Sequence, residues 1–130
     1  MTEEQLLKSG ERINQLFSTD IKIIQNSEVF SYSVDSVLLS RFPRFPKNGL
    51  IVDFCAGNGA VGLFASSRTK AKILSVEIQE RLADMAERSV RLNGLEGQMQ
   101  VICDDLKNMP SHIQGSKVDL ILCNPPYFKV

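Results

Sequence analysis

Two short stretches of this chain place reactive or ligand-binding residue types at telling spacings. The first, Leu50 to Gly62, reads LIVDFCAGNGAVG: an apolar run that reaches Asp53 and then glycines in a GxGxxG spacing. Such glycines let a backbone turn tightly, approach a ligand and pack the next helix against the strand before it. This stretch predicts a strand, a ligand-binding loop and a helix.

The nature of that ligand is indicated by Asp53. A dinucleotide would place its pyrophosphate against the loop N–H groups and the helix N-terminus. A carboxylate four residues before Gly57 would repel phosphate, but it suits a ligand with an ammonium group. S-adenosylmethionine (SAM) has such a group and no phosphate, so we expect Asp53, Ala56, Gly57 and Gly59 to bind SAM rather than NAD.

The second stretch is Asn124-Pro125-Pro126-Tyr127, directly after the apolar run VDLILC. Two prolines remove backbone donors and fix the chain, which leaves carbonyl oxygens and the Asn124 side-chain oxygen as acceptors. Acceptors of this kind suit a planar NH₂ group, and Tyr127 offers a face for stacking. Asn-Pro-Pro is also an ordinary strand terminator, but its position downstream of the glycine loop favours a role in orienting an amine for methyl transfer.

Composition limits the class of protein. The chain has 130 residues, 43% of them hydrophobic, and 15 basic against 15 acidic residues. These numbers predict one globular domain that buries about two-thirds of its unfolded surface. No basic stripe indicates nucleic acid, so an RNA substrate would need basic residues clustered by the fold or supplied by sequence absent here. Without an 18-residue apolar span or a signal-peptide pattern, we expect a cytoplasmic protein with no membrane partner.

The cysteines and the single histidine show no metal-ligand spacing, so we expect no metal site. Cys55, Cys103 and Cys123 lie in or just after apolar runs and are predicted to be buried free thiols. With no acid or nucleophile patterned around it, His112 is predicted to lie in a surface loop.

Residues 1–49 are predicted to form a lead-in to the core. Thr2 to Phe17 suggests a short helix with a break at Ser9-Gly10, and Ile21–Gln25 with Val29–Tyr32 suggests a hairpin. Ser33 or Asp35 could cap a helix that ends near Arg41. The proline-containing stretch from Phe42 to Gly49 then predicts an irregular connection.

Residues 50–130 alternate strands with helices. The predicted strands are Leu50–Phe54, Lys72–Glu77, Met99–Cys103 and Val118–Cys123; the predicted helices are Ala60–Ser67 and Gln79–Asn93. This alternation predicts an α/β fold with a parallel sheet and right-handed crossovers. Such a sheet binds its ligand at the carboxyl ends of its strands.

Acidic residues follow two more of these strands. Glu77 lies 20 residues after Gly57, a separation at which an acid can reach both hydroxyls of a ribose. Asp104 or Asp105, after the third strand, could accept a hydrogen bond from an adenine amino group. The alternative is that this pair only caps the turn at Leu106-Lys107.

In this order, DFCAGNGAVG, Glu77, Asp104-Asp105 and NPPY resemble the motifs of class I SAM-dependent amino-methyltransferases. The lead-in segments ERINQL, DIKIIQ and FSYSVDSVLL resemble the bacterial family that methylates the adenine N6 amine in the anticodon loop of valine tRNA. The resemblance implies a Rossmann-like sheet with core strand order 3-2-1-4, SAM as cofactor and tRNA or another RNA as partner.

The resemblance also implies residue roles. Asp53, Gly57 and Gly59 would hold the methionine part of SAM, Glu77 the ribose, and Asp104 or Asp105 the adenine. Asn124 and Pro125 would grip the target amine, with Pro126 completing the motif and Tyr127 stacking on the base. The segment that includes Tyr32 and Asp35 would cover the cofactor.

Family members continue with about three more strands, whereas this sequence stops three residues after NPPY. We therefore expect a fragment of a methyltransferase with an uncovered fourth strand, whose edge could support self-association. Three alternatives remain: a protein-glutamine methyltransferase acting on release factors, which also carries NPPY; a non-catalytic SAM-binding module; and an NAD-dependent oxidoreductase, which Asp53 and NPPY disfavour.

Overall fold

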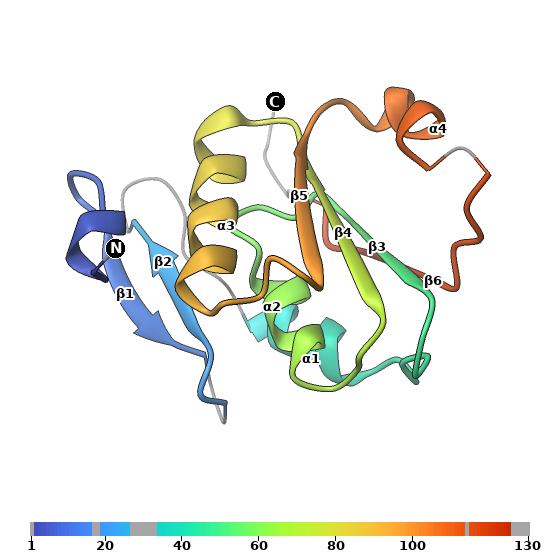
Figure 1. Cartoon of the computed structure of the whole chain (residues 1–130), viewed down its shortest axis with the longest axis horizontal. Helices are drawn as coiled ribbons and strands as arrows, with labels where there is room; N and C mark the ends of the chain where they lie inside the picture. The colour runs from blue at the N-terminus through green and yellow to red at the C-terminus, as the bar shows by residue number, and fades with distance from the viewer. Residues whose placement is uncertain (1, 17–18, 27–33, 114, 126–130) are drawn as a thin grey trace.

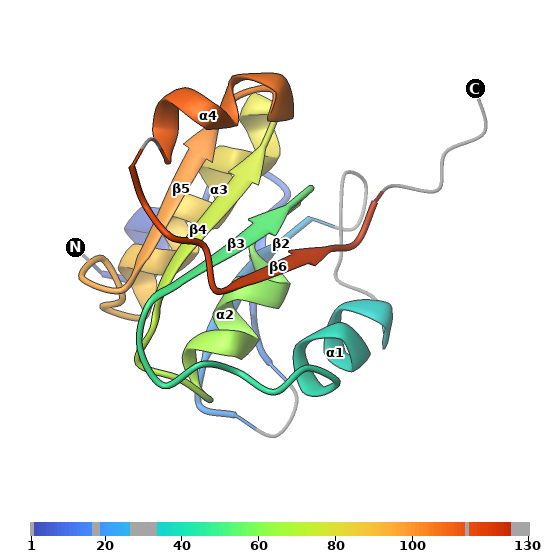
Figure 2. The ribbon, with the colours of Figure 1, turned by 90° about the vertical axis from the view of Figure 1, so that its right-hand side faces the viewer.

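The core of the protein is a four-stranded parallel sheet. The computed structural model describes residues 2–16, 19–26, 34–113 and 115–125. Its strands are β3 (Leu50–Phe54), β4 (Lys72–Glu77), β5 (Met99–Cys103) and β6 (Leu120–Cys123). They lie in the order β5-β4-β3-β6 (Figures 1 and 2). The predicted order 3-2-1-4 is confirmed, and only the last strand differs, since it begins two residues later than predicted.

Helices cover both faces of this sheet. The helices α1 (Val34–Arg41), α2 (Ala60–Ser66) and α3 (Glu80–Leu92) lie on one face, where Ile51 points. On the other face, η2 (Leu106–Asn108) leads into α4 (Met109–His112), and Met109 packs against Val52. Because alternate residues of a strand face opposite sides, burial of both Ile51 and Val52 explains why β3 is apolar up to Asp53.

The predicted helix ends agree closely with the structure. Gln79 and Asn93 flank α3 as its caps, and α1 ends at Arg41. Asp35 lies in the first turn of α1 rather than before it, so it is not the cap residue. Its negative charge in the first turn still stabilises the helix through the helix dipole. The stretch from Phe42 to Gly49 is irregular, as predicted.

The predicted N-terminal helix is wrong. Residues Glu4–Leu6 form only the short 3-10 helix η1, and Arg12–Gln15 form a strand, β1. Gly10 between them has a φ of +78°, which turns the chain in a way that glycine tolerates. The helical spacing of apolar residues does not predict this strand. Ile13 lies in β1 and packs in a hydrophobic cluster with residues of α3, and this tertiary contact decides its structure.

The predicted hairpin has a different partner strand. β2 (Lys22–Gln25) pairs antiparallel with β1, with Ile13 opposite Ile24. The other predicted arm, Val29–Tyr32, lies outside the described residues. The lead-in also joins the core, since Leu16 and Ile23 are fully buried in the same cluster as Ile51. The domain boundary at residue 49 stays a prediction.

Side chains of the core occupy the second edge of β2. Asn93 bonds both the N–H and the carbonyl of Lys22, the Ser89 hydroxyl accepts from Ile24 N at 2.9 Å, and the Asn58 amide donates to Ile24 O at 3.1 Å. Backbone groups that a neighbouring strand would normally pair are therefore satisfied by α3 and the glycine loop. Figure 1 shows α3 between this hairpin and the main sheet.

A buried ion pair fixes the N-terminal segment to α3. Arg88 donates to both oxygens of Glu11 and, at 2.7 Å, to the carbonyl of Leu6. The two charged side chains are only 9% and 2% exposed. The pair with Arg88 is the main reason that the pKa of Glu11 is lowered. Arg88 also pairs with Asp84, four residues before it in α3, at 3.0 Å.

The cysteines are less buried than predicted. Cys55 is half-buried, and Cys103 and Cys123 are exposed. The prediction of buried thiols is therefore wrong for the last two, because both end edge strands of the described sheet. No helix in the described ranges is long and apolar enough to cross a membrane.

The ion pair gives a stability prediction. Arg88→Leu should destabilise the protein by about 3–5 kcal/mol, because it leaves the Glu11 charge buried without its partner. The double variant Glu11→Leu/Arg88→Leu should recover much of that loss. Urea unfolding measures both, and Arg91→Leu, which breaks the exposed pair with Glu87, should cost less than about 1 kcal/mol. A double variant no more stable than Arg88→Leu would contradict this account.

Candidate functional site

The carboxyl ends of the four strands bring together most of the predicted site residues. Phe54 lies level with Cys123 on the neighbouring strand, so the glycine loop and Asn124 begin side by side. Glu77 lies level with Cys103 on the other side, next to Asp104. Asp53 and Asn124, 71 positions apart in sequence, thus share one edge of the sheet, which we call the carboxyl edge.

The glycine loop has the conformation that the sequence predicts. Gly57 and Gly59 have φ values of +57° and +91°, in the region that glycine adopts without strain. A Cβ at Gly59 would lie 3.1 Å from that of Ala86, and one at Gly62 would lie 2.9 Å from the Ser75 hydroxyl. The first two glycines therefore shape the loop, whereas Gly59 and Gly62 also let α2 approach α3 and the sheet.

Glu77 holds this loop in place. One oxygen of its carboxylate accepts from the Gly57 N–H at 2.8 Å, and the other accepts from the Gln79 N–H at 2.9 Å. An ionised carboxylate can accept about four hydrogen bonds, so two positions remain for ligand hydroxyls. The side chain predicted to bind ribose thus also sets the conformation of the loop beside it.

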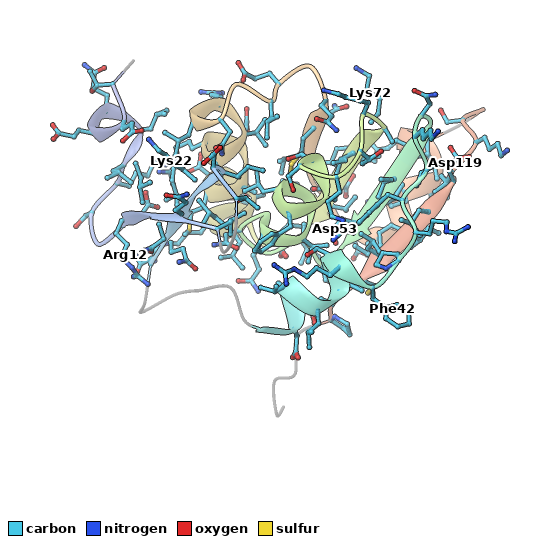
Figure 3. The ribbon with its side chains drawn as sticks, turned by 90° about the horizontal axis from the view of Figure 1, so that it is seen from below. Arg12, Lys22, Phe42, Asp53, Lys72 and Asp119 are labelled. Carbon is cyan, nitrogen blue, oxygen red and sulfur yellow. The ribbon has the colours of Figure 1, made fainter. Side chains whose placement is uncertain are left out.

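Asp53 is buried within β3, the strand that leads into the loop. It is 1% exposed, and Figure 3 shows it in the interior of the molecule. Among the described residues, none donates a hydrogen bond to either carboxyl oxygen; the N–H of Gly62 is near but outside hydrogen-bond geometry. Its register partner Ser75 also has a buried hydroxyl without a partner in the same part of the chain. Buried polar atoms of this kind are costly unless a ligand or solvent group reaches them.

Burial changes the charge of Asp53. Loss of hydration, and to a lesser degree the negative charge of Glu77, raises the pKa of Asp53 to about 8. The carboxyl group is therefore largely protonated at neutral pH when no cation is near. A ligand ammonium group beside it would favour the ionised form, which fits the predicted contact with the methionine end of SAM.

Two residues of the loop were not predicted to matter. Cys55 has a φ of +57°, an unusual value for a residue with a side chain, and such strain is concentrated at functional sites. Burial, then the neighbouring Cys123, raises the pKa of the Cys55 thiol to about 11, which disfavours the reactive thiolate form. Asn58 is fully buried and connects the loop to β2. Its position inside a GxG sequence was the only available signal.

Asp104 and Asp105 accept hydrogen bonds from different partners, which gives the two residues different roles. Asp105 accepts from the Lys107 N–H and caps η2, which is the alternative role considered for this pair. Asp104 accepts from Asn108 and lies 2.8 Å from the ring of His112. Hydrogen bonds from Asn108, then His112, lower the pKa of Asp104 to about 2. The prediction of an isolated loop histidine is wrong, because His112 ends α4 and pairs with Asp104.

Asn124 faces α1. Its amide nitrogen lies 3.4 Å from the hydroxyl of Ser36 in α1, which leaves its oxygen available as an acceptor. Asn124 is half-buried and Pro125 is exposed. Pro126, Tyr127 and Tyr32 lie outside the described residues, and Asp35 is exposed at the start of α1. The roles predicted for all of these residues stay predictions.

Fold and edge together define the class of this domain: a Rossmann-like α/β unit with a glycine loop that Glu77 holds at the carboxyl edge. A family model described as "Methyltransferase small domain" matches residues 20–129. The chain therefore belongs to the methyltransferase small domain family.

Relatives of known name point the same way. A protein of Shewanella halifaxensis named tRNA1(Val) (adenine(37)-N6)-methyltransferase is 31% identical over 96 residues, which is 74% of this chain and 39% of that protein. A protein of the same name from Bacteroides fragilis is 29% identical over 94 residues, 72% of this chain and 40% of that protein. The chain spans about two-fifths of the length of these relatives.

Solved structures confirm the fold. A SAM-dependent methyltransferase from Agrobacterium tumefaciens matches 95% of this chain and 42% of its own, with a TM-score of 0.67 and 19% identity. The P. horikoshii protein TYW2, solved with MeSAdo, matches 78% of this chain and 38% of its own, with a TM-score of 0.65 and 19% identity.

The buried carboxyl group of Asp53 makes a pH prediction. Because its pKa is raised from 3.8 to about 8, the folded protein binds a proton that the unfolded chain releases above about pH 4. This contribution to stability is complete below pH 4 and is lost between about pH 4 and 8. Asp53→Asn removes the dependence, so it should stabilise the protein more at pH 8 than at pH 5, by a few kcal/mol.

Urea unfolding of both proteins at the two pH values measures this difference. Asp20→Asn, at an exposed position between β1 and β2, is the matched control and should change stability equally at both. An Asp53→Asn effect that is the same at pH 5 and pH 8 would show that the Asp53 carboxyl group is ionised in the folded protein at both.

Proposed function

We propose that this chain carries the cofactor-binding and amine-orienting part of a SAM-dependent methyltransferase that modifies the N6 amine of adenine in tRNA. The observation that carries the proposal is the carboxyl edge itself. It holds a glycine loop fixed by Glu77 over the unpartnered Asp53, and Asn124-Pro125 follows the adjacent strand. An acidic site that suits a ligand without phosphate would thus lie beside hydrogen-bond acceptors for an NH₂ group.

The cofactor would lie across the glycine loop. Glu77 has free acceptor positions for two ribose hydroxyls while it keeps its bond to Gly57. Asp53 would ionise when the ligand ammonium group approaches, and the backbone of Ala56, Gly57 and Gly59 allows close contact. Asp104 or Asp105 would contact the adenine; Asp104 reaches it only if it shares its oxygens with His112 and Asn108. Tyr32 and Asp35 would cover the site.

The amine would be held at the end of β6. SAM, when bound, would supply an electrophilic methyl group to the amine nitrogen; its sulfur would leave as a neutral thioether, and one amine proton would pass to solvent. The side-chain oxygen of Asn124 and the carbonyl of Pro125 accept hydrogen bonds from the two N–H groups of the amine. These bonds aim the nitrogen lone pair at the methyl group. Pro126 keeps the backbone rigid and Tyr127 stacks on the base. The chain provides orientation and electrostatic stabilisation rather than a strong base.

Adenine in tRNA is the best-supported substrate. Relatives that match about three-quarters of the chain are named for adenine-N6 methylation of tRNA1(Val). A base in an anticodon loop would have to leave its stack to reach Asn124. Such a substrate places the protein in the cytoplasm.

The proposal is tested in two assays. Isothermal titration of this chain with SAM and with NADH should show binding of SAM and not of NADH. Transfer of a labelled methyl group is then measured with the protein as its gene encodes it, on a tRNA(Val) transcript and on a release factor. Label in the tRNA adenine supports the proposal; label in a release-factor glutamine, or SAM binding without any transfer, refutes it in favour of one of the alternatives.

The division of roles gives a paired prediction. Asn124→Ala should abolish methyl transfer but leave the dissociation constant for SAM within a few-fold, because Asn124 faces the amine. Glu77→Gln should weaken the binding of SAM by about tenfold or more, since it removes a charged hydrogen-bond acceptor from both the loop and the ribose. Titration and transfer assays on the two variants decide the matter. Loss of SAM affinity in Asn124→Ala would show that Asn124 contacts the cofactor.

A further inference from the structure

Basic residues collect at the starts of the core strands, opposite the carboxyl edge. The four segments that meet there are residues 42–49, 68–72, 94–98 and 115–119. Together they carry six exposed basic side chains: Arg44, Lys47, Arg68, Lys70, Lys72 and Lys117. We call this surface the amino edge. Figure 3 views the molecule from this side, with Lys72 and Asp119 labelled.

Hydrogen bonds between the segments hold these charges together. Thr69 donates its hydroxyl proton to the Pro46 carbonyl, and Gln98 donates to the Thr69 and Ala71 carbonyls. The Leu50 N–H donates to Asp119 at 2.9 Å, which ties the last segment to the first. The basic residues therefore come from four separate parts of the sequence but sit on one connected surface.

The charge of this surface is far from that of the whole chain. Only two carboxylates, Glu96 and Asp119, accompany the six basic residues, which leaves four net positive charges in a chain whose total is zero. Asp119 pairs with Lys117 at 3.8 Å and accepts from the Leu50 N–H, so its charge is directed at Lys117. The rest of the chain is correspondingly acidic.

Three of the basic side chains have no competing partner. Arg44, Lys47 and Lys70 make no hydrogen bond or ion pair with any residue that the structure describes, and all three are exposed. Lys72 donates to the Gly97 carbonyl and Arg68 lies over the Phe45 ring at 5.8 Å, so these two are held in place by the protein. Arg44, Lys47 and Lys70 can therefore bind a polyanion without breaking contacts within the protein.

We propose that the amino edge binds the phosphate backbone of the RNA substrate. This inference rests on the proposed function, which makes RNA the substrate. The carboxyl edge cannot supply this attraction, because Asp104 and Glu77 add negative charge where the base must enter. Arginine and lysine at the other end of the sheet neutralise phosphates and release their counterions, which supplies affinity without sequence recognition.

The distance between the two edges suits a folded RNA. Strands of five or six residues span about 17–20 Å, so one RNA molecule could place a looped-out base at Asn124 and a more distant backbone segment on the amino edge. A mononucleotide or dinucleotide that carries the target base could not reach both. We therefore expect the amino edge to favour a folded tRNA over a short oligonucleotide that contains the same target base.

The test is the triple variant Arg44→Gln/Lys47→Gln/Lys70→Gln of this chain. Binding of an unmodified tRNA(Val) transcript is measured from 50 to 200 mM salt. The variant should bind at least about tenfold more weakly, and its slope of log affinity against log salt should be smaller by about 2–3, because each lost phosphate contact removes nearly one unit. SAM affinity should be unchanged.

The matched control is Lys8→Gln/Arg81→Gln/Arg91→Gln, which removes the same charge from exposed positions on or against α3. This control should keep the wild-type slope. A control that loses as much as the test variant, or a wild-type chain that binds no tRNA, would overturn the proposal. The chain could instead bind polyglutamate as tightly as tRNA and lose that binding in the triple variant. This result would assign the amino edge to an acidic protein.

The two proposals fail in different ways. If tRNA binding depends on the amino edge but no adenine is methylated, the proposed reaction is wrong and the RNA surface stands. If adenine is methylated and the triple variant binds tRNA like the wild type, the reaction stands and the amino edge is not the RNA surface.

Discussion

The hydrogen bond between the Glu77 carboxylate and the Gly57 N–H is the interaction on which the candidate site depends. It joins the end of β4 to the loop after β3, in which Cys55, Gly57 and Gly59 all have positive φ values. The same bond places a negative charge above Asp53, which adds to the effect of burial on that residue. Loop shape, ribose acceptor and the protonation of the buried acid are thus linked through one side chain.

The core could be predicted from sequence because its signals are local. A continuous apolar strand, a GxGxxG loop and an amphipathic helix that ends before Gly94 each determine their own structure, and their alternation leaves few possible topologies. The close approach of Gly59 to Ala86 and of Gly62 to Ser75 also agrees with the packing role expected of the glycines. The presence of Asp53, Glu77 and Asn124 at one edge followed from strand direction alone.

The remaining features depend on contacts between distant segments. Nothing near Arg12–Gln15 indicates a strand, because its pairing with β2 and its packing beside α3 decide its structure. Glu11 reads as a surface residue until Arg88 is placed against it, 77 residues away. The bond of Asp104 to His112 requires the turn through η2, and the clustering of Lys47, Lys70 and Lys117 requires the sheet. Sequence order hides all of these.

The side chains that cover the second edge of β2 have a consequence for how this protein can change over time. Asn93, Ser89 and Asn58 each match one backbone position of the strand, and a slip of one residue would break all three matches and turn Ile23 and Ile24 to the wrong sides. Insertions or deletions before Lys22 must therefore be absorbed in the turn, never in the strand. A spliced or shuffled gene that exchanged the N-terminal hairpin would have to bring its own anchor for the cofactor loop.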